Sequence, residues 1–251
     1  CYNEAATIQD IIQKTQAVDL GPGWDREIIV VDNYSTDGTR DILQKIDDPE
    51  IQIIYHERNM GKGMSIRTGI AHMSGSYFFI QDADNEYDPF EQRKFTDLAA
   101  QTNAPAIFGS RVLGGEIKSK YRRTLMGNRF VTWLHNVLFN DHLTDVATAS
   151  KMVRADVAHS LNLTCTGFDL DFEMPDKIAM AGHKITEIPI NYDPRTYAEG
   201  KKIGPKDAVK AVQTMLRDRL GLSPALKSSI VNRHRQSRLN YENCCYRLYC
   251  L

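Results

Sequence analysis

The sequence has no long hydrophobic run and few cysteines, and both features narrow the classes of protein that it can encode. The longest stretch without Asp, Glu, Lys or Arg covers residues 68–81, which is shorter than the roughly 20 apolar residues that span a bilayer. The five cysteines show no paired CxxC spacing, so the pattern supports neither a disulfide framework nor a zinc site. No secretory signal pattern precedes the first helical segment, and we expect a cytoplasmic protein.

The chain also lacks an excess of charge of either sign. It holds 31 Lys and Arg against 32 Asp and Glu, a formal net charge of -1, so no global basic field favours duplex nucleic acid as a partner. The balance is uneven, because residues 201–251 carry 11 Lys and Arg against 3 Asp and Glu. A basic C-terminal region is typical of contact with phosphates or with an anionic membrane surface.

The first half of the chain alternates short strands with helices. Apolar runs at 27–31, 51–55 and 77–80 are separated by helical spacing at 39–46 and 63–73. Strands that alternate with helices through short polar loops are typical of an α/β fold with a mainly parallel sheet. The 42% of hydrophobic residues in a chain of 251 is enough to form the core of such a fold.

The second half has a different pattern, and the chain opens abruptly. A basic, aromatic-rich helix is expected over 120–139, with strands near 151–153 and 184–190. Residues 1–4 lead directly into helical spacing, so the chain begins at a strand-to-helix turn with no strand before it. We therefore expect the first strand of the sheet to be missing.

Two carboxylates follow the buried strand at 77–80. Asp82 and Asp84 lie two residues apart where that strand ends, and Glu86 follows closely. In parallel sheets ligands bind beyond the carboxyl ends of the strands. Carboxylates on a partly rigid turn suit Mg²⁺ or Mn²⁺ bound together with substrate phosphates. Asp-x-Asp is also common in solvated loops, and its position after a strand is what favours a metal site here.

Six motifs resemble, in their order, those of family 2 glycosyltransferases. They are Cys1-Tyr2-Asn3-Glu4, Val31-Asp32-Asn33-Tyr34-Ser35-Thr36-Asp37-Gly38-Thr39, Asn59-Met60-Gly61-Lys62-Gly63, Gln81-Asp82-Ala83-Asp84, Gly109-Ser110-Arg111 and Arg195-Thr196-Tyr197-Ala198-Glu199-Gly200-Lys201-Lys202. The last is most similar to the polyprenyl-phosphate branch, which includes the dolichol-phosphate mannose synthases. The resemblance implies a Rossmann-like GT-A fold, a GDP- or UDP-sugar donor, a divalent cation and inversion at the anomeric carbon.

The resemblance also implies roles for single residues. Three matched positions contact the nucleotide: Tyr2, Glu4 and Asp32. The metal-binding pair of the family matches Asp82 and Asp84, and Glu86 matches a further ligand on the metal side. The resemblance also implies that Asp82 contacts the nucleotide sugar. The positions that contact phosphates match Arg111, Arg195, and Lys201 or Lys202.

Some positions depart from the family pattern. Asn33 and Tyr34 stand where many relatives have Asp-Gly, which bears on the preference for base and sugar. Residues 147–150 replace a more usual small-Gly-aromatic run, which bears on the acceptor pocket. Gly61-Lys62-Gly63 lacks the spacing of a phosphate-binding P-loop and predicts a tight turn into a helix beside the nucleotide.

The chemistry of sugar transfer can be argued from the residues alone. Cleavage of a sugar-diphosphate bond leaves negative charge on the nucleotide, which a bound cation and basic side chains offset. The predicted catalytic residues are Asp82, Asp84, Arg111 and Arg195. An acceptor phosphate is already largely dianionic at pH 7 and needs no base, but it needs a cationic seat. Candidates for that seat are Arg111, Arg122, Arg123 and Arg129. A hydroxyl acceptor needs a base instead, and Asp145 is the candidate.

The apolar residues of the helix at 120–139 allow two interpretations. They face the core, or they lie in a lipid surface with the arginines at headgroup level. The second interpretation implies peripheral contact with the cytosolic face of a membrane, alone or through a membrane-anchoring subunit.

We predict one catalytic domain over 1–222, with a nucleotide-sugar and metal half (1–115) and an acceptor half (116–222), followed by a flexible basic tail over 223–251. The function that the sequence favours is transfer of a hexose, mannose or glucose, to a dolichyl or undecaprenyl phosphate. Transfer to a sugar hydroxyl of a polysaccharide or glycolipid stays open, as does a non-catalytic subunit that binds a nucleotide sugar.

Overall fold

The computed structural model describes residues 1–114, 122–195, 205–222 and 246–250, and only the backbone of 122–125, 205, 206 and 246–250. The strands are β1 (Trp24–Asp32), β2 (Ile51–Tyr55), β3 (Tyr77–Phe79), β4 (Ala106–Ser110), β5 (Lys151–Arg154), β6 (Ile185–Pro189) and β7 (Tyr246–Cys250). The helices are α1 (Ile8–Ala17), α2 (Thr39–Leu43), α3 (Lys62–His72), η1 (Pro89–Glu91), α4 (Gln92–Thr102), α5 (Arg122–Phe139), α6 (Ala155–Ser160), α7 (Leu170–Met180) and α8 (Pro205–Arg219).

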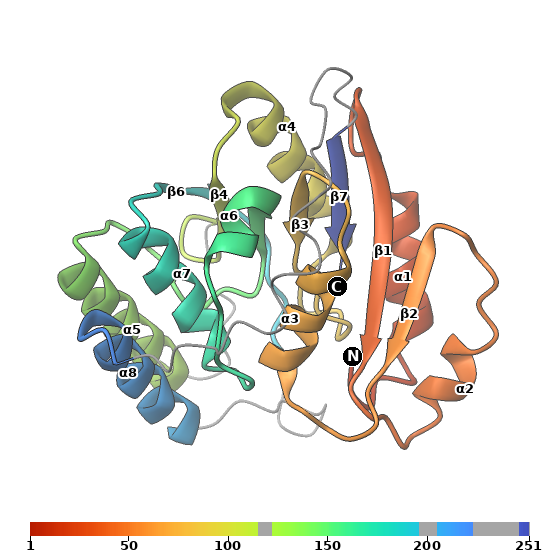
Figure 1. The fold of residues 1–251 in the computed structure, drawn as a ribbon, viewed down its shortest axis with the longest axis horizontal. Helices are drawn as coiled ribbons and strands as arrows, with labels where there is room; N and C mark the ends of the chain where they lie inside the picture. Colours follow the sequence, from red (N-terminus) through yellow and green to blue (C-terminus); the bar gives the residue numbers. More distant parts are fainter. Residues whose placement is uncertain (115–121, 196–204, 223–245, 251) are drawn as a thin grey trace.

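The strands form one sheet in the order β2-β1-β7-β3-β5-β4-β6. Neighbouring strands are parallel except on the two sides of β5, which runs antiparallel to β3 and to β4. Helices cover both faces of this sheet (Figure 1). The predicted mainly parallel α/β architecture is confirmed.

The centre of the sheet is filled by a strand from the C-terminal region. β7 pairs in parallel with β1 on one side and with β3 on the other. The amino group of Cys1 donates to the Val31 carbonyl at 2.7 Å, and the Asn33 amide donates to the Cys1 carbonyl at 2.9 Å. Cys1 therefore continues the line of β7 further along β1.

Residues 246–250 form a strand, whereas the sequence analysis predicted a flexible tail over 223–251. The facing edges of β1 and β3 carry backbone donors and acceptors, and such groups require partners when they are buried. β7 supplies those partners. Its sequence, Tyr-Arg-Leu-Tyr-Cys, contains two tyrosines, which favour strands. This composition was the available signal for a strand at 246–250.

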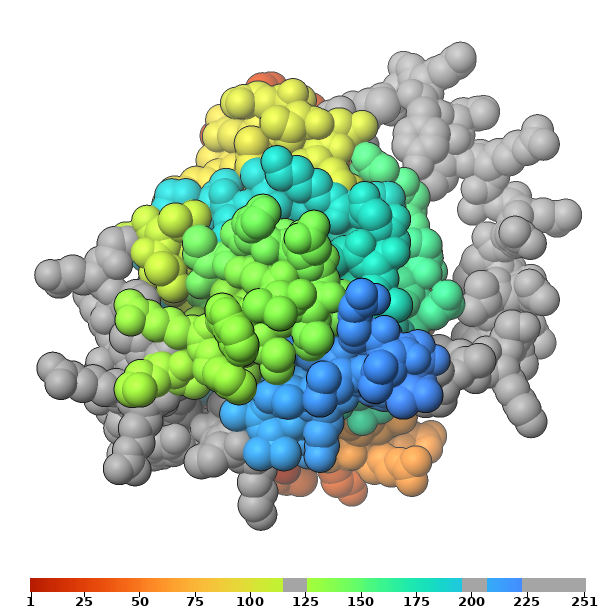
Figure 2. All heavy atoms as spheres, turned by 90° about the vertical axis from the view of Figure 1, so that its left-hand side faces the viewer, coloured from red at the N-terminus to blue at the C-terminus, as the bar shows by residue number. Residues whose placement is uncertain are grey.

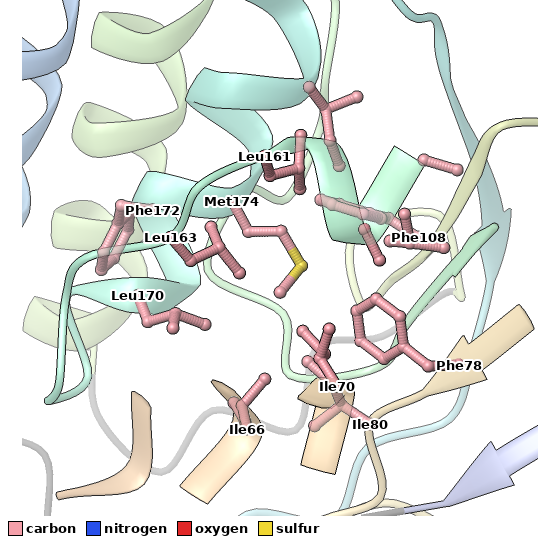
Figure 3. Packing of buried hydrophobic residues seen from close by; sticks show 14 of the residues in the cluster. Ile66, Ile70, Phe78, Ile80, Phe108, Leu161, Leu163, Leu170, Phe172 and Met174 are labelled. Atoms are coloured by element: carbon pink, nitrogen blue, oxygen red, sulfur yellow. The ribbon is translucent and has the colours of Figure 1, made fainter. Parts of the chain in front are cut away.

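The core lies on both faces of the sheet because successive strand residues point to opposite sides. Ile29 and Val31 of β1 join the cluster under α3, α5, α6, α7 and α8, part of which is drawn in Figure 3. Ile28 and Val30 join the cluster under α1 and α2. The fold is thus a layer of helices on each face of one sheet.

The turn before α3 packs closely against the segment that leads into α7. Gly61 has a φ of 89°, and a Cβ placed there would lie 2.3 Å from the carbonyl oxygen of Thr166. A Cβ on Gly63 would lie 2.8 Å from the carbonyl oxygen of Gly167. Only glycine permits this approach, which brings Lys62 at the start of α3 next to α7. The predicted tight turn is confirmed.

Helix α5 is fastened to α7 through a buried histidine. His135 is fully buried, with Nδ1 2.7 Å from an Asp176 oxygen and Nε2 3.5 Å from an Asp141 oxygen. Burial alone lowers the pKa of His135, but hydrogen bonds and charge from the two carboxylates outweigh it and raise the pKa above 6.5. The imidazolium therefore holds the middle of α5 against the core.

We expect disruption of the β7 ladder to destabilise the whole sheet. Leu248 pairs with Arg26 and Tyr77, and Leu248→Pro removes an amide donor from a central strand. The free energy of unfolding in urea should fall by about 3 kcal/mol, the scale of proline's cost inside regular structure. Leu248→Val is the matched control and should stay near wild type. Equal urea midpoints for the two variants would contradict this role of β7.

The histidine contact predicts a dependence of stability on pH. Because the folded pKa of His135 lies above its unfolded value of 6.5, the stabilisation is present below pH 6.5 and is lost as pH rises through the folded pKa. His135→Gln should lower the free energy of unfolding by about 3 kcal/mol at pH 6.5 and by clearly less at pH 9. His72→Gln, at an exposed histidine, serves as the control. A loss that does not shrink with pH would show that His135 acts only by packing.

Candidate active site

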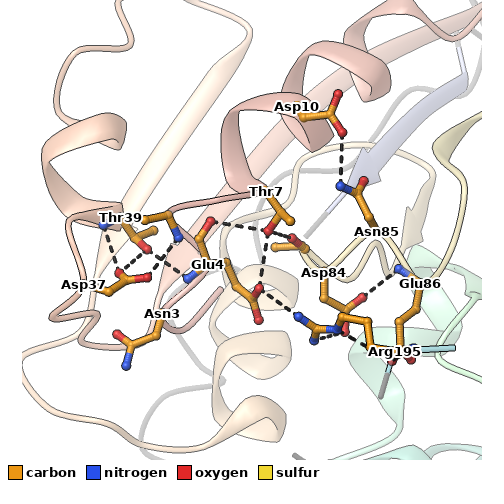
Figure 4. Close-up of polar contacts among 12 residues, drawn as sticks. Asn3, Glu4, Thr7, Asp10, Asp37, Thr39, Asp84, Asn85, Glu86 and Arg195 are labelled. Atoms are coloured by element: carbon orange, nitrogen blue, oxygen red, sulfur yellow. Dashed lines mark hydrogen bonds and ion pairs between the residues drawn. The ribbon is translucent and has the colours of Figure 1, made fainter. Parts of the chain in front are cut away.

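The two predicted metal ligands lie on a turn at the carboxyl end of β3. The hydroxyl of Thr7 donates to the Ala83 carbonyl at 2.6 Å, and Asn85 donates to Asp10 at 3.1 Å. These bonds tether the turn to the segment around α1, and the carboxylates of Glu4 and Asp84 both point toward the guanidinium of Arg195 (Figure 4).

Each of the two aspartates is paired with a cation of the chain. Lys62 Nζ lies 3.1 Å from Asp82, and Arg195 Nη2 lies 2.6 Å from Asp84 Oδ2. Nη1 of Arg195 reaches Glu4 Oε2 at 3.3 Å. The arrangement brings together residues from the two ends of the predicted domain, which the motif order alone does not place side by side.

Glu86 positions Arg195. One oxygen of Glu86 accepts from the Arg195 backbone amide at 3.0 Å, and the other accepts from the Tyr192 hydroxyl at 2.7 Å. Among the described residues no group of three His, Cys, Asp or Glu side chains converges as a metal site. The structure therefore shows Glu86 engaged with the arginine, whereas its role as a metal-side ligand stays a prediction.

The acidic turn carries more negative charge than its two cations neutralise. Burial, with the nearby charges of Asp82 and Glu86, raises the pKa of Asp84 to about 7 even though Arg195 is in contact with it. A divalent cation relieves this repulsion, and Mg²⁺ and Mn²⁺ bind through one or two carboxylates with water and phosphate as the other ligands. Asp82 and Asp84 are thus a donor set that fits such an ion.

A second charged group lies behind the acidic turn, and the sequence analysis missed it. Lys62 lies 3.4 Å from Asp171 of α7, and the fully buried Lys151 lies 3.5 Å from the same carboxylate. Burial lowers the pKa of Lys151. Burial would lower the pKa of Lys62 too, but Asp171 and Asp82 raise it. Lys62 is therefore held as a cation beside Asp82, and its place between glycines was the available signal.

The predicted nucleotide residues lie at the neighbouring strand end. Asp32 is fully buried and accepts from Arg40 Nε at 2.5 Å. The Arg40 guanidinium lies between the rings of Tyr34 and Tyr55, 5.2 Å and 5.3 Å from their centroids. Tyr34 has a φ of 70°, a conformation that costs a bulky residue energy, and it occupies the place where many relatives have Gly. The sequence analysis missed Arg40.

The other departure from the family pattern has a structural role. The side-chain oxygen of Asn33 accepts from the Met60 amide at 2.8 Å and lies 3.0 Å from His56 Nδ1. Asn33 therefore holds the turn that precedes α3. Glu4 is buried, and its amide donates to the Thr39 hydroxyl at 3.0 Å. Tyr2, two residues before Glu4 in the same motif, is half-buried.

Arg111 and Asp145 form a buried pair at the end of β4. Asp145 accepts from Arg111 Nε at 2.6 Å, from Nη2 at 2.8 Å and from the Arg111 amide at 3.1 Å. Asn128 of α5 donates to it at 2.9 Å. Burial raises the pKa of Asp145, but Arg111 outweighs burial and lowers it. A carboxylate with four donors and a lowered pKa is a weak base, so the geometry does not favour Asp145 as the base for a hydroxyl acceptor.

Two of the arginines predicted for the acceptor phosphate have described side chains, and these two lie in different surroundings. The guanidinium carbon of Arg111 lies 5.0 Å from the centroid of the Tyr192 ring. Arg129, in contrast, is exposed on the outer side of α5. Only the backbone of Arg122 and Arg123 is described, and Lys201 and Lys202 lie outside the described residues. Of these two described side chains, Arg111 is the one linked to the acidic turn, through Tyr192 and Glu86.

Comparison with known proteins identifies relatives of this chain. The family model described as Glycosyl transferase family 2 matches residues 1–161. Glycosyltransferase AglJ of Haloferax volcanii is 25% identical over 205 residues, 81% of this chain and 64% of the relative. Dolichyl-phosphate beta-glucosyltransferase ALG5C of Trichomonas vaginalis is 31% identical over 121 residues, 44% of this chain and 36% of the relative. The chain thus spans less than two thirds of these two proteins.

The chain also resembles a third relative in sequence and two solved structures in fold. Undecaprenyl-phosphate mannosyltransferase of Micrococcus luteus is 24% identical over 190 residues, 71% of this chain and 76% of the relative. Glucosyl-3-phosphoglycerate synthase of Mycobacterium tuberculosis, in complex with uridine diphosphate, superposes with a TM-score of 0.62 at 18% identity, over 87% of this chain and 77% of that one. The same enzyme with Mn²⁺, UDP-glucose and phosphoglyceric acid gives 0.60 at 18%, over 90% and 79%. The fold is GT-A-like.

The pairing of Arg195 with Asp84 predicts competition between this arginine and a divalent ion. Arg195→Met removes a cation 2.6 Å from Asp84, and at pH 8, above the pKa of Asp84, Mn²⁺ should bind the nucleotide-free protein at least about fivefold more tightly. Calorimetric titration with Mn²⁺ measures this. Arg93→Met removes an exposed arginine that pairs with Asp19 and Asp97 and is the control. Unchanged or weaker binding by Arg195→Met would exclude such competition.

Proposed function

The chain belongs to glycosyl transferase family 2, and from this premise we propose that it transfers a hexose from a nucleotide-diphosphate sugar to a polyprenyl phosphate. The observation that carries the choice of acceptor is the pair of Arg111 and Asp145. It presents a half-buried guanidinium near the acidic turn, and the candidate base Asp145 accepts three hydrogen bonds from Arg111 and one from Asn128. Such a site suits an anionic nucleophile better than a hydroxyl that must lose a proton.

The donor side of the reaction uses the acidic turn. A Mg²⁺ or Mn²⁺ ion bound by Asp82 and Asp84 supplies charge neutralisation for the departing diphosphate. Lys62 fixes the orientation of Asp82, and Arg195, released from Asp84, becomes available to the phosphates of the donor. Glu86 retains the backbone of Arg195 through its amide, so the guanidinium moves while the chain at this residue stays anchored.

The nucleotide half of the donor lies at the ends of β1 and β2 in this proposal. Asp32 and Glu4 are buried there, and the stack of Tyr34, Arg40 and Tyr55 lines the same strand ends. The donor is a GDP- or UDP-hexose, with mannose or glucose as the sugar. Lys201 and Lys202 are assigned to the donor phosphates by their motif alone.

On the acceptor side, a phosphate oxygen attacks the anomeric carbon from the face opposite the diphosphate. The bond from that oxygen to the sugar forms as the bond from the sugar to the diphosphate breaks, so the configuration inverts and a nucleoside diphosphate leaves. The acceptor is a dianion at pH 7, and no proton has to be removed. Arg111 holds the phosphate, with Arg122 and Arg123 at the start of α5 as further candidates, whereas Arg129 lies exposed further along the helix.

Two relatives support this acceptor, since they are a dolichyl-phosphate glucosyltransferase and an undecaprenyl-phosphate mannosyltransferase. Such acceptors lie in membranes, and no helix among the described residues is long and apolar enough to cross one. Because the proposed acceptor is a membrane lipid, we propose a peripheral position at the cytosolic face of a membrane, with a membrane-anchoring subunit as partner.

The reaction is tested by incubating the protein with labelled GDP-mannose, UDP-glucose and other nucleotide sugars, polyprenyl phosphate, and Mg²⁺ or Mn²⁺. Label should enter the organic phase with one donor and not in the presence of EDTA. Label that enters only a sugar hydroxyl acceptor would replace the proposal by polysaccharide or glycolipid synthesis. Donor binding without transfer to either acceptor would indicate a non-catalytic subunit.

Loss of one metal-side carboxylate should reduce turnover strongly. Asp84→Ala is expected to lower kcat by at least about 100-fold, the scale for removing one electrostatic stabiliser of a transition state. Asp47→Ala changes an exposed aspartate outside the site and should leave kcat unchanged. If Asp84→Ala turns over normally in excess Mn²⁺, Asp84 has no part in the mechanism.

A further inference from the structure

Two helices on the acceptor side of the molecule expose large apolar side chains to solvent. α5 and α8 lie side by side on one face (Figures 1 and 2). The exposed fractions of these apolar side chains run from 43% for Leu216 to 70% for Met126. The exposed apolar side chains, here named the α5/α8 face, are Met126, Phe130, Trp133, Val137, Val209, Leu216 and Leu220.

The spacing of these residues shows that they form a stripe on each helix. Positions 126, 130, 133 and 137 are separated by three or four residues, as are the exposed positions 209, 213, 216 and 220. Residues with this spacing lie on one side of a helix. The opposite sides of the two helices are buried, through Val131 and His135 on α5 and through Ala211 and Met215 on α8. The α5/α8 face is therefore a second apolar side, apart from the one in the core.

The charge around this face has one sign. Among the described side chains of the two helices, the exposed charged residues are Arg129, Lys210 and Arg219. The acidic residues of α8 do not share this exposure, because Asp207 is half-buried and Asp218 is buried. Large apolar side chains bordered by basic ones are the pattern of a helix that lies in the interface of an anionic bilayer.

We propose that the α5/α8 face docks on an anionic phospholipid surface, with both helices parallel to the membrane plane. A second copy of the chain fits the face less well, since a twofold contact would bring its basic side chains opposite one another. The aromatic rings of Phe130 and Trp133, whose centroids are 6.0 Å apart, enter the region between headgroups and acyl chains. Lys210 and Arg219 contact lipid phosphates.

The inner side of α5 connects this surface to the site. Asn128 of α5 donates to Asp145, and Asp145 holds Arg111. One helix therefore faces lipid on one side and orients the proposed acceptor seat on the other. This part of the inference rests on the proposed function, whereas docking on lipid does not.

Docking is tested with vesicles in the absence of any substrate. The protein should sediment with vesicles of equal phosphatidylglycerol and phosphatidylcholine, and much less with phosphatidylcholine alone. Trp133→Gln and the double variant Lys210→Glu/Arg219→Glu should each weaken binding at least about tenfold. Matched controls are Phe90→Gln, at an exposed aromatic residue on η1, and Lys45→Glu/Lys184→Glu, at exposed lysines outside the two helices.

Fluorescence gives a second readout. The chain has two tryptophans, and emission should shift to shorter wavelength on vesicle addition in the wild type but not in Trp133→Phe. Equal sedimentation of all variants, or no vesicle-dependent shift, would overturn the proposal. Dimerisation at micromolar concentration that Trp133→Gln abolishes would assign the face to a second copy and overturn it as well.

An assay with a short, water-soluble prenyl phosphate separates this inference from the proposed function. Trp133→Gln should retain wild-type turnover of that acceptor while losing turnover of long-chain polyprenyl phosphate in vesicles. Failure of the wild type to use either acceptor, with normal vesicle binding, would reject the proposed function and leave the docking surface standing.

Discussion

Repulsion among the carboxylates after β3 is the interaction on which the rest of the site depends. Asp82, Asp84 and Glu86 lie within five residues at a partly buried strand end, and their mutual repulsion with burial raises the pKa of Asp84 to about 7. Lys62 and Arg195 reduce this repulsion from two sides. A turn with this much uncompensated charge recruits further positive charge, which is what a metal-dependent transfer of a nucleotide sugar requires.

The fold positions those two cations by different means. Lys62 reaches Asp82 because the glycines before and after it let α3 approach α7 within backbone contact. Arg195 reaches Asp84 because Glu86 binds its backbone amide. The first contact is built into the packing of the core, whereas the second is a side-chain contact at the end of the described segment. Lys62 is therefore suited to orient the acidic turn, and Arg195 to exchange partners when a donor binds.

Helix α5 makes different contacts on its inner and outer sides. His135 fastens the middle of the helix to α7, Asn128 bonds the buried pair of Asp145 and Arg111, and Trp133 stands exposed on the outer side. The core-facing interpretation of this helix is confirmed for Val131 and His135, whereas its contact with lipid stays a proposal. In the proposed function, this polar contact to the site and the apolar outer stripe would together hold a lipid phosphate near the donor.

The sequence by itself determined the mainly parallel α/β sheet, the glycosyltransferase family and the positions of Asp82 and Asp84, because period-two apolar runs and strand-end motifs are local features. Only the tertiary structure decided that Lys62, Asp171 and Lys151 form one group, that Asp145 is bound by Arg111, and that α8 lies beside α5. It also placed residues 246–250 at the sheet centre. These are contacts between residues 20 to more than 200 positions apart, and no local pattern encodes which partner a charged side chain or a strand edge will find.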